Sequence, residues 1–183
     1  MKRNIFTMAM AVISIACVGQ SKNIEPEYIG QVAIINADST IMLLQKETTE
    51  MKTKTSKWGM LPVPGAGALD KSKVNLIVKG ASSPTKLSKG SVTLIVKVTD
   101  NNVDPKQAFG IFKFEVKKKN RQYLLAEAGL ISGMKATTSF NTVESNVKKY
   151  GSNCYLVTIE NLEAGEYGIT TGDFTNVATI SVE

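Results

Sequence analysis

Three oxygen-bearing side chains stand at alternate positions in the stretch TDNNVDPK, which is the first candidate for metal chemistry in this chain. They are Asp100, Asn102 and Asp104, and alternate oxygen ligands open the calcium loop of an EF-hand. That loop also needs glycine at its sixth position and glutamate at its twelfth, where this chain has Pro105 and Ile111. The stretch is therefore interpreted as a strand-ending turn, because Asn and Asp cap their own backbone in turns. The alternative is a calcium site of another kind, completed by a distant carboxylate.

Nucleophilic catalysis has few residues to use, because the 183 residues contain no histidine. Ser-His-Asp and Cys-His mechanisms are excluded, together with the commonest neutral metal ligand. The spacing S-x-x-K of serine–lysine enzymes occurs three times, but no S-D-N or K-T-G partner accompanies it and a chain rich in both residues contains such matches by chance. The three matches are Ser83 with Lys86, Ser132 with Lys135 and Ser145 with Lys148.

Paired carboxylates could still hydrolyse a glycoside if two of them faced each other in a cleft. The acidic residues of this chain fall mainly in turns or on the polar side of alternating stretches, which favours a solvated role. We therefore expect a protein that is not an enzyme, with no catalytic residue, no metal and no cofactor. The alternative function is a carbohydrate-active or Ser-Lys hydrolase that works without histidine.

The N-terminus has the pattern of a secretory signal peptide, residues 1–19. Two basic residues precede a short apolar run, and polar sequence follows, so a retained transmembrane helix is the weaker interpretation. Cleavage is expected after Gly19 or Ala16, and lipidation of Cys17 is a third possibility. The expected location is therefore the periplasm, the outer membrane surface or the extracellular space.

Charge and cysteine content limit the partners. Removal of the signal peptide takes away two basic residues and lowers the formal net charge from +6 to +4. Only Arg121 remains as an arginine, which disfavours nucleic acid as a partner because nucleic-acid-binding proteins cluster Arg and Lys on one face. Cys154 is the single cysteine expected to survive processing, so no internal disulfide is available and a hydrophobic core must hold residues 20–183 as one domain. In the stretch CYLVTIE it is expected to be a buried structural thiol.

The pattern of the chain predicts an all-β fold, because short β-branched runs alternate with clusters of Gly, Asn, Asp, Ser and Pro. The spacing favours a single antiparallel β-sandwich, of which an immunoglobulin-like domain is one form. A tight connection KKKN after the alternating run IFKFEV predicts a hairpin, and TTEMKTKTSK predicts a solvated edge extension of the preceding strand. The expected strands cover residues 29–35, 39–47, 74–80, 92–98, 109–116, 121–128, 154–160, 166–171 and 177–182.

Candidate binding residues lie on the predicted loops and turns, which connect the strands at the ends of the sandwich. Trp58 begins the glycine- and proline-rich stretch WGMLPVPGAGALD, where it could stack on a sugar or plug the end of the sandwich. Lys117, Lys118, Lys119 and Arg121 concentrate positive charge at the hairpin tip, where they could bind an anionic polysaccharide or lipid headgroups, although a solvated turn is the usual role. Arg121 could also form a fork to Glu115 or Glu166, or merely a surface pair.

Two longer stretches carry a family resemblance: VKVTDNNVDPKQAFGIFKFE and KKYGSNCYLVTIENLEAGEYGI. Together they resemble a group of exported β-rich proteins of gut Bacteroidetes with a K-Y-G-x-S-x-Y strand followed by a P-G-E-Y-G-like turn. Here Ala164 replaces the frequent proline, and Asn153 and Cys154 replace small polar residues. The resemblance implies exported β-structure and supplies no catalytic residue.

These patterns favour a noncatalytic exported envelope protein with a binding or scaffolding role. Its partner is not identified by the sequence, and a glycan or another envelope protein fits the expected location. A third hypothesis is self-assembly through the edge strand rich in threonine and lysine.

Overall fold

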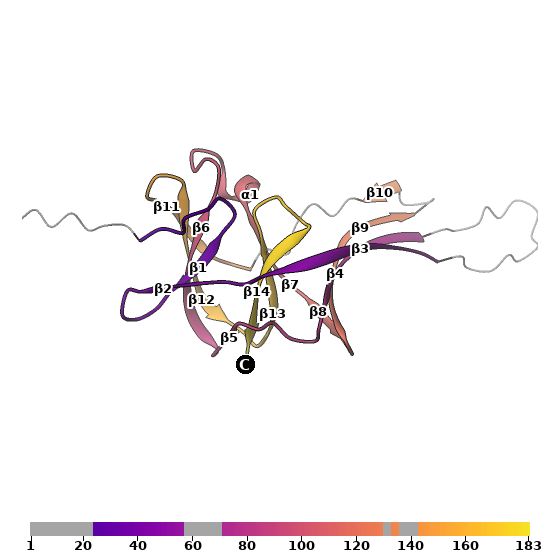
Figure 1. Cartoon of the computed structure of the whole chain (residues 1–183). Coiled ribbons are helices and arrows are strands. Elements are labelled where there is room, and N and C mark those ends of the chain that lie inside the picture. Colours follow the sequence, from indigo (N-terminus) through magenta and orange to yellow (C-terminus); the bar gives the residue numbers. More distant parts are fainter. Residues whose placement is uncertain (1–23, 57–70, 130–132, 136–142) are drawn as a thin grey trace, which may run out of the picture.

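The computed structural model describes residues 24–56, 71–129, 133–135 and 143–183 (Figure 1). The predicted signal peptide, Trp58 and Ser132 lie outside these residues. The described residues form fourteen strands and one four-residue helix. No helix among them has the length and apolar character needed to cross a membrane. The elements are β1 (Val32–Ile35), β2 (Ile41–Leu43), β3 (Lys46–Ser56), β4 (Lys71–Lys79), β5 (Lys86–Leu87), β6 (Gly90–Lys97), α1 (Pro105–Ala108), β7 (Gly110–Lys113), β8 (Glu115–Lys117), β9 (Asn120–Gly129), β10 (Gly133–Lys135), β11 (Asn146–Tyr150), β12 (Cys154–Leu162), β13 (Gly165–Thr170) and β14 (Asn176–Val182).

Two sheets pack face to face, which confirms the predicted all-β sandwich. One sheet has the order β11-β12-β6-β1-β2, and β7, β13 and β14 are neighbours in the other. Seven strands make up the basic sandwich. In chain order, the first (β1), second (β6), fourth (β11) and fifth (β12) lie in one sheet, in the spatial order first, second, fifth, fourth. The third (β7), sixth (β13) and seventh (β14) lie in the facing sheet. That is the strand order of the immunoglobulin sandwich. The short strand β5 adds a parallel pairing to β14.

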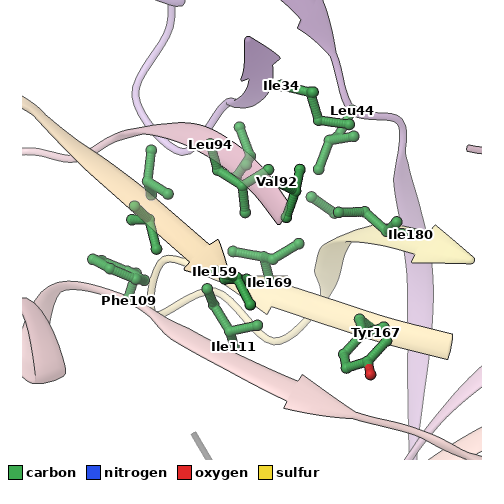
Figure 2. Close-up of a cluster of buried hydrophobic side chains, with 14 of the residues drawn as sticks. Ile34, Leu44, Val92, Leu94, Phe109, Ile111, Ile159, Tyr167, Ile169 and Ile180 are labelled. Carbon is green, nitrogen blue, oxygen red and sulfur yellow. The ribbon is translucent and has the colours of Figure 1, made fainter. Parts of the chain in front are cut away.

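The first core fills the space between these sheets, and its residues come from alternate positions of the strands (Figure 2). In β6, Val92, Leu94 and Val96 face inward, as expected for a period of two. Ile169 and Ile180 meet them from β13 and β14. Cys154 is fully buried in β12, as its sequence context predicts.

Two insertions build a second core on the far side of the β7-β13-β14 sheet. Strands β2 to β5 lie between β1 and β6 in the chain, and β8 to β10 lie between β7 and β11. Their pairing continues the sheet in the order β14-β3-β4-β9, and β8 then pairs with β9. Because only Phe114 separates β7 from β8, the sheet curls until it is nearly closed. The buried residues of this second core are Leu76, Val78, Phe112, Phe114 and Val177.

Some sequence-based expectations need correction. β5, β10 and β11 were not among the predicted strands; β5 and β10 are too short to show a period, and β11 has the lysine-rich sequence NVKKY. β3 does extend through residues 48–56 as predicted. β14 pairs with residues 46–48, so the strand has an open edge only in its outer half, where β4 is its one neighbour among the described residues. The predicted hairpin is confirmed, with Lys117 paired to Asn120 across its turn.

Gly168 in β13 allows the aromatic residues of the second core to approach the sheet. A Cβ atom at this position would lie 2.7 Å from the Phe112 ring and 2.9 Å from the Phe114 ring. These distances are shorter than ordinary van der Waals contact, so a methyl group would displace both rings.

We predict that Gly168→Ala lowers the free energy of unfolding by about 1–3 kcal/mol, the usual cost of overpacking a core. Urea denaturation measures it. In a Phe112→Leu background, where the nearest ring atoms are removed, the same substitution should cost less. An equal cost in both backgrounds would contradict this explanation.

Candidate functional site

The basic hairpin tip, Lys117–Lys119, is exposed, as the sequence predicts. Lys118 lies in the turn with a φ of 38°. Lys117 pairs with Glu115, and Glu115 also accepts a hydrogen bond from Gln122 at 2.9 Å. The tip therefore offers a small, exposed cationic surface, in which Lys117 is paired with Glu115.

Arg121 does not belong to that surface. Its side chain is fully buried and points into the second core, so the interpretation as a surface pair is wrong. Nη2 donates to both carboxylate oxygens of Glu47 at 2.8 Å, and Nη1 lies 3.6 Å from Glu166. Glu166 was one of the two expected partners, whereas Glu47 was not expected.

The backbone and an aromatic ring complete the surroundings of Arg121. Nε donates to the carbonyl of Gly80 and Nη2 to that of Lys79, both at 3.1 Å. The guanidinium carbon lies 5.8 Å from the centre of the Phe114 ring, within cation–π range. Nη1 has no hydrogen-bond partner among the described residues, which leaves its contact with Glu166 purely electrostatic.

Two hydroxyl groups and one backbone N–H also donate to the two carboxylates. Thr179 donates to Glu47 at 2.5 Å and shares a 2.8 Å hydrogen bond with Ser83. Glu166 accepts from the backbone N–H of Ser83 at 2.7 Å and from the hydroxyl of Ser82 at 2.9 Å. The network thus ties β3, β9, β13 and β14 to the segment after β4.

This arrangement is a structural ion cluster, because both carboxylates find donors within it, although Nη1 of Arg121 makes no hydrogen bond among the described residues. Two carboxylates on one guanidinium would be costly if buried without partners, and here each has at least two donors or a close cation. Sequence reasoning missed Glu47 because nothing local to β3 indicates a half-buried glutamate that faces inward. The only available signal was the isolated arginine in a lysine-rich chain.

The serine–lysine hypothesis gains no geometric support from Ser83. The hydroxyl of Ser83 is buried against Thr179, whereas Lys86 donates to Ser82 and Ser181 and pairs with Glu183 at 2.6 Å. Lys86 is therefore not the partner of Ser83 that the S-x-x-K spacing would require.

The stretch TDNNVDPK forms turns, as predicted. The carboxylate of Asp100 accepts from the backbone and side chain of Asn102 at 2.9 and 2.8 Å. Asp104 caps α1 by accepting from the backbone N–H of Lys106 at 2.8 Å. No group of three or more potential His, Cys, Asp or Glu ligands occurs in the described parts of the chain.

A second polar cluster fastens the first described residues to the five-stranded sheet. Glu25 accepts from Lys97 at 2.7 Å and from the backbone N–H of Ser152 at 3.1 Å. The hydrogen bond from Lys97 holds the pKa of Glu25 below its ordinary value of 4.5. The thiol of Cys154 lies 3.6 Å from the same carboxylate. Burial, and then the charge of Glu25, raise the pKa of this thiol to about 11, which fits an unreactive structural cysteine.

A cavity of about 430 Å³ lies beside α1 at one end of the first core. Phe109, Ile111 and Val147 give it an apolar lining, and Asp104 and Lys106 stand at its rim. Val143, which closes one side, directly follows residues outside the described part of the chain, so we assign this cavity no ligand.

Replacing Arg121 should be strongly destabilising, because both carboxylates would lose their cation. We predict that Arg121→Met lowers the free energy of unfolding by about 3–5 kcal/mol, the usual cost of removing one partner from a buried ion pair. Arg121→Lys should recover only part of this loss, since an ammonium cannot reproduce the contacts of the guanidinium. Chemical denaturation measures both, with Lys118→Met on the exposed tip as control. A loss below about 1 kcal/mol for Arg121→Met would contradict the ion cluster.

The Glu25 contact should make stability depend on pH. Because folding lowers the pKa of Glu25, its contribution is complete above pH 4.5 and is lost as the pH falls through the folded-state pKa. We therefore expect the difference in unfolding free energy between wild type and Glu25→Gln to be larger at pH 7 than at pH 3. Glu27→Gln, an exposed neighbour, serves as control. A pH-independent difference would argue against an ionic role for Glu25.

Comparison with known proteins adds no relative: no family model, no curated protein and no solved structure matches the chain. The resemblance to exported Bacteroidetes proteins therefore stays a prediction, and the function must be argued from the geometry of this chain.

Proposed function

We propose that the protein is an exported, noncatalytic component of the cell envelope that binds or scaffolds another envelope component through an arm of strands. The arm comprises residues 50–56 of β3, 71–75 of β4 and 124–129 of β9, together with β10. Beyond Thr49 the strand β3 leaves β14, so the arm extends away from the sandwich (Figure 1).

The single observation that carries this proposal is the position of the arm relative to the start of the described chain. Glu25 is fixed to Lys97 at the end of β6, and the carbonyl of Ile24 accepts from Tyr150 of β11. These contacts lie at one side of the molecule, and the arm projects from the opposite side (Figure 1). A protein held at a membrane by its N-terminus would present the arm outward.

The chemistry of the described residues supports a binding role over catalysis. The carboxylates and hydroxyls that lie close together, around Arg121, are committed to one another inside the second core. The arm, in contrast, exposes Lys52 and Lys54 on one face and Met51 on the other. Exposed mixed surfaces of this kind fit recognition better than turnover.

The basic hairpin tip is the competing contact surface. Like the arm, the tip is positively charged, but its exposed backbone is limited to a short turn. Variants can separate the two surfaces because their lysines belong to different strands.

The test is binding of the processed protein to isolated Bacteroidetes cell envelopes, the source that the family resemblance implies, measured by co-sedimentation over a range of concentrations. We expect saturable binding that weakens at least tenfold in Lys52→Glu/Lys54→Glu, because the charge of the arm is reversed. Lys89→Glu/Lys148→Glu changes two exposed lysines elsewhere and should bind like wild type. Loss of binding in Lys117→Glu/Lys118→Glu alone would transfer the site to the tip, and no saturable binding in wild type would refute the proposal.

A further inference from the structure

The outer half of β3 has one backbone edge with no strand beside it among the described residues. Near its start, the N–H of Thr49 donates to Thr175 at 2.9 Å, and the N–H of Thr179 donates to Gln45 at 3.3 Å. Odd-numbered residues of β3 therefore direct their N–H and C=O groups toward β14. β14 pairs with β3 only through residues 46–48, and the hydrogen bond from Thr49 to Thr175 is the last contact along this edge. The N–H and C=O groups of residues 51, 53 and 55 therefore point to a free edge.

The opposite edge of the same strand is fully used. β4 pairs with β3 from Thr49 to Ser56, and its hydrogen bonds go to the even-numbered residues by the same alternation. The free edge is thus held straight by a complete ladder on its other side. It is a preformed template for one more strand.

The side chains that flank this edge differ between its two faces. Met51 shares its face with Leu76, which belongs to the second core, and 58% of its surface is exposed. Lys52 and Lys54 project from the other face and are exposed. Lys52 pairs with Glu50 at 3.1 Å, but Glu50 also pairs with Lys79, so the outer face keeps an excess of positive charge.

A second copy of this chain fits the edge poorly. If the β3 strands of two copies paired antiparallel about Met51, Lys52 of each copy would lie opposite Glu50 of the other. This register would also place the second strand beside Thr49, where β14 already occupies the edge. Moving the centre to Thr53 avoids β14 and sets Lys52 opposite Lys54, and like charges directly opposite each other are destabilising. The lysines therefore oppose self-pairing and leave the edge to a strand of opposite charge.

We propose that the free edge of β3 is a strand-addition site for an extended segment of a partner polypeptide. The side chains of that segment would alternate, with carboxylates beside Lys52 and Lys54 and apolar groups beside Met51. Backbone hydrogen bonds to residues 51, 53 and 55 would provide the register. This inference rests on the proposed function, because it specifies how the arm makes its contact.

Thr53 allows a test that separates backbone pairing from charge. Its N–H points to the free edge and not to β4, so Thr53→Pro removes an outward donor without breaking the ladder that holds the arm, as is tolerated at sheet edges. Thr53→Val is the matched control, since it keeps the N–H. Circular dichroism and urea denaturation establish that both variants fold.

The probe is a capped synthetic nonapeptide that alternates glutamate and valine, and its control replaces every glutamate by lysine. Fluorescence anisotropy should show binding of the glutamate peptide at least tenfold tighter than that of the lysine peptide. Thr53→Pro should weaken this binding at least tenfold and Thr53→Val should not. Lys52→Glu/Lys54→Glu should reverse the preference between the peptides. Amide hydrogen exchange at Met51 and Thr53 should slow when the glutamate peptide is bound.

Three results would overturn the inference: no binding of the glutamate peptide, equal binding by Thr53→Pro and wild type, or a mass in light scattering that rises with concentration and falls in Thr53→Pro. The last result would show that a second copy occupies the edge. The proposed function can survive each failure, because envelope binding that depends on Lys52 and Lys54 but not on the N–H of Thr53 would keep the arm as the contact surface and discard strand addition.

Discussion

Burial of the β7-β13-β14 sheet on both faces is the constraint on which the rest of this structure depends. An ordinary sandwich sheet alternates inward apolar residues with outward polar ones. Here the outward face has a second core, so Ile111 packs on one side and Phe112 on the other. Neither face of the sheet is left to solvent, and each side chain must fit a defined space. Gly168 shows how narrow that space is, since the two neighbouring phenylalanine rings occupy the volume of its missing side chain.

The same constraint explains the ion cluster. Strands β13 and β14 carry polar residues at the positions that would face solvent in a simple sandwich, and closure of the sheet buries Glu166, Thr179 and Ser181 instead. Burial without partners would cost several kcal/mol for a charged group. For Glu166, Arg121 and the backbone N–H of Ser83 remove much of that cost, and they come from the two insertions that close the sheet. The cluster and the closed sheet therefore depend on each other.

The sandwich and the arm have different roles in the function proposed for this protein. The sandwich and the second core hold the base of β3, β4 and β9, whereas the outer parts of these strands lack a second layer among the described residues. A strand ladder with a firm base can project without losing its register. The Glu25 contact fixes the beginning of the described chain at the opposite side, so the two ends of the molecule have separate tasks in the function proposed for it.

Much of this architecture could be predicted from local patterns, because a strand in a half-buried sheet shows its period in the sequence. The alternation in β6, β7 and β12, the hairpin before Arg121 and the turn at Asp100 all follow from residues a few positions apart. The absence of histidine likewise restricts catalysis without any structure. Only the tertiary structure decided that the insertions close a second sheet, that Arg121 turns inward to Glu47, and that β3 keeps one open edge. Those outcomes depend on pairings between residues more than 40 positions apart. The free energies of these pairings arise from burial and desolvation and leave no periodic pattern in the sequence.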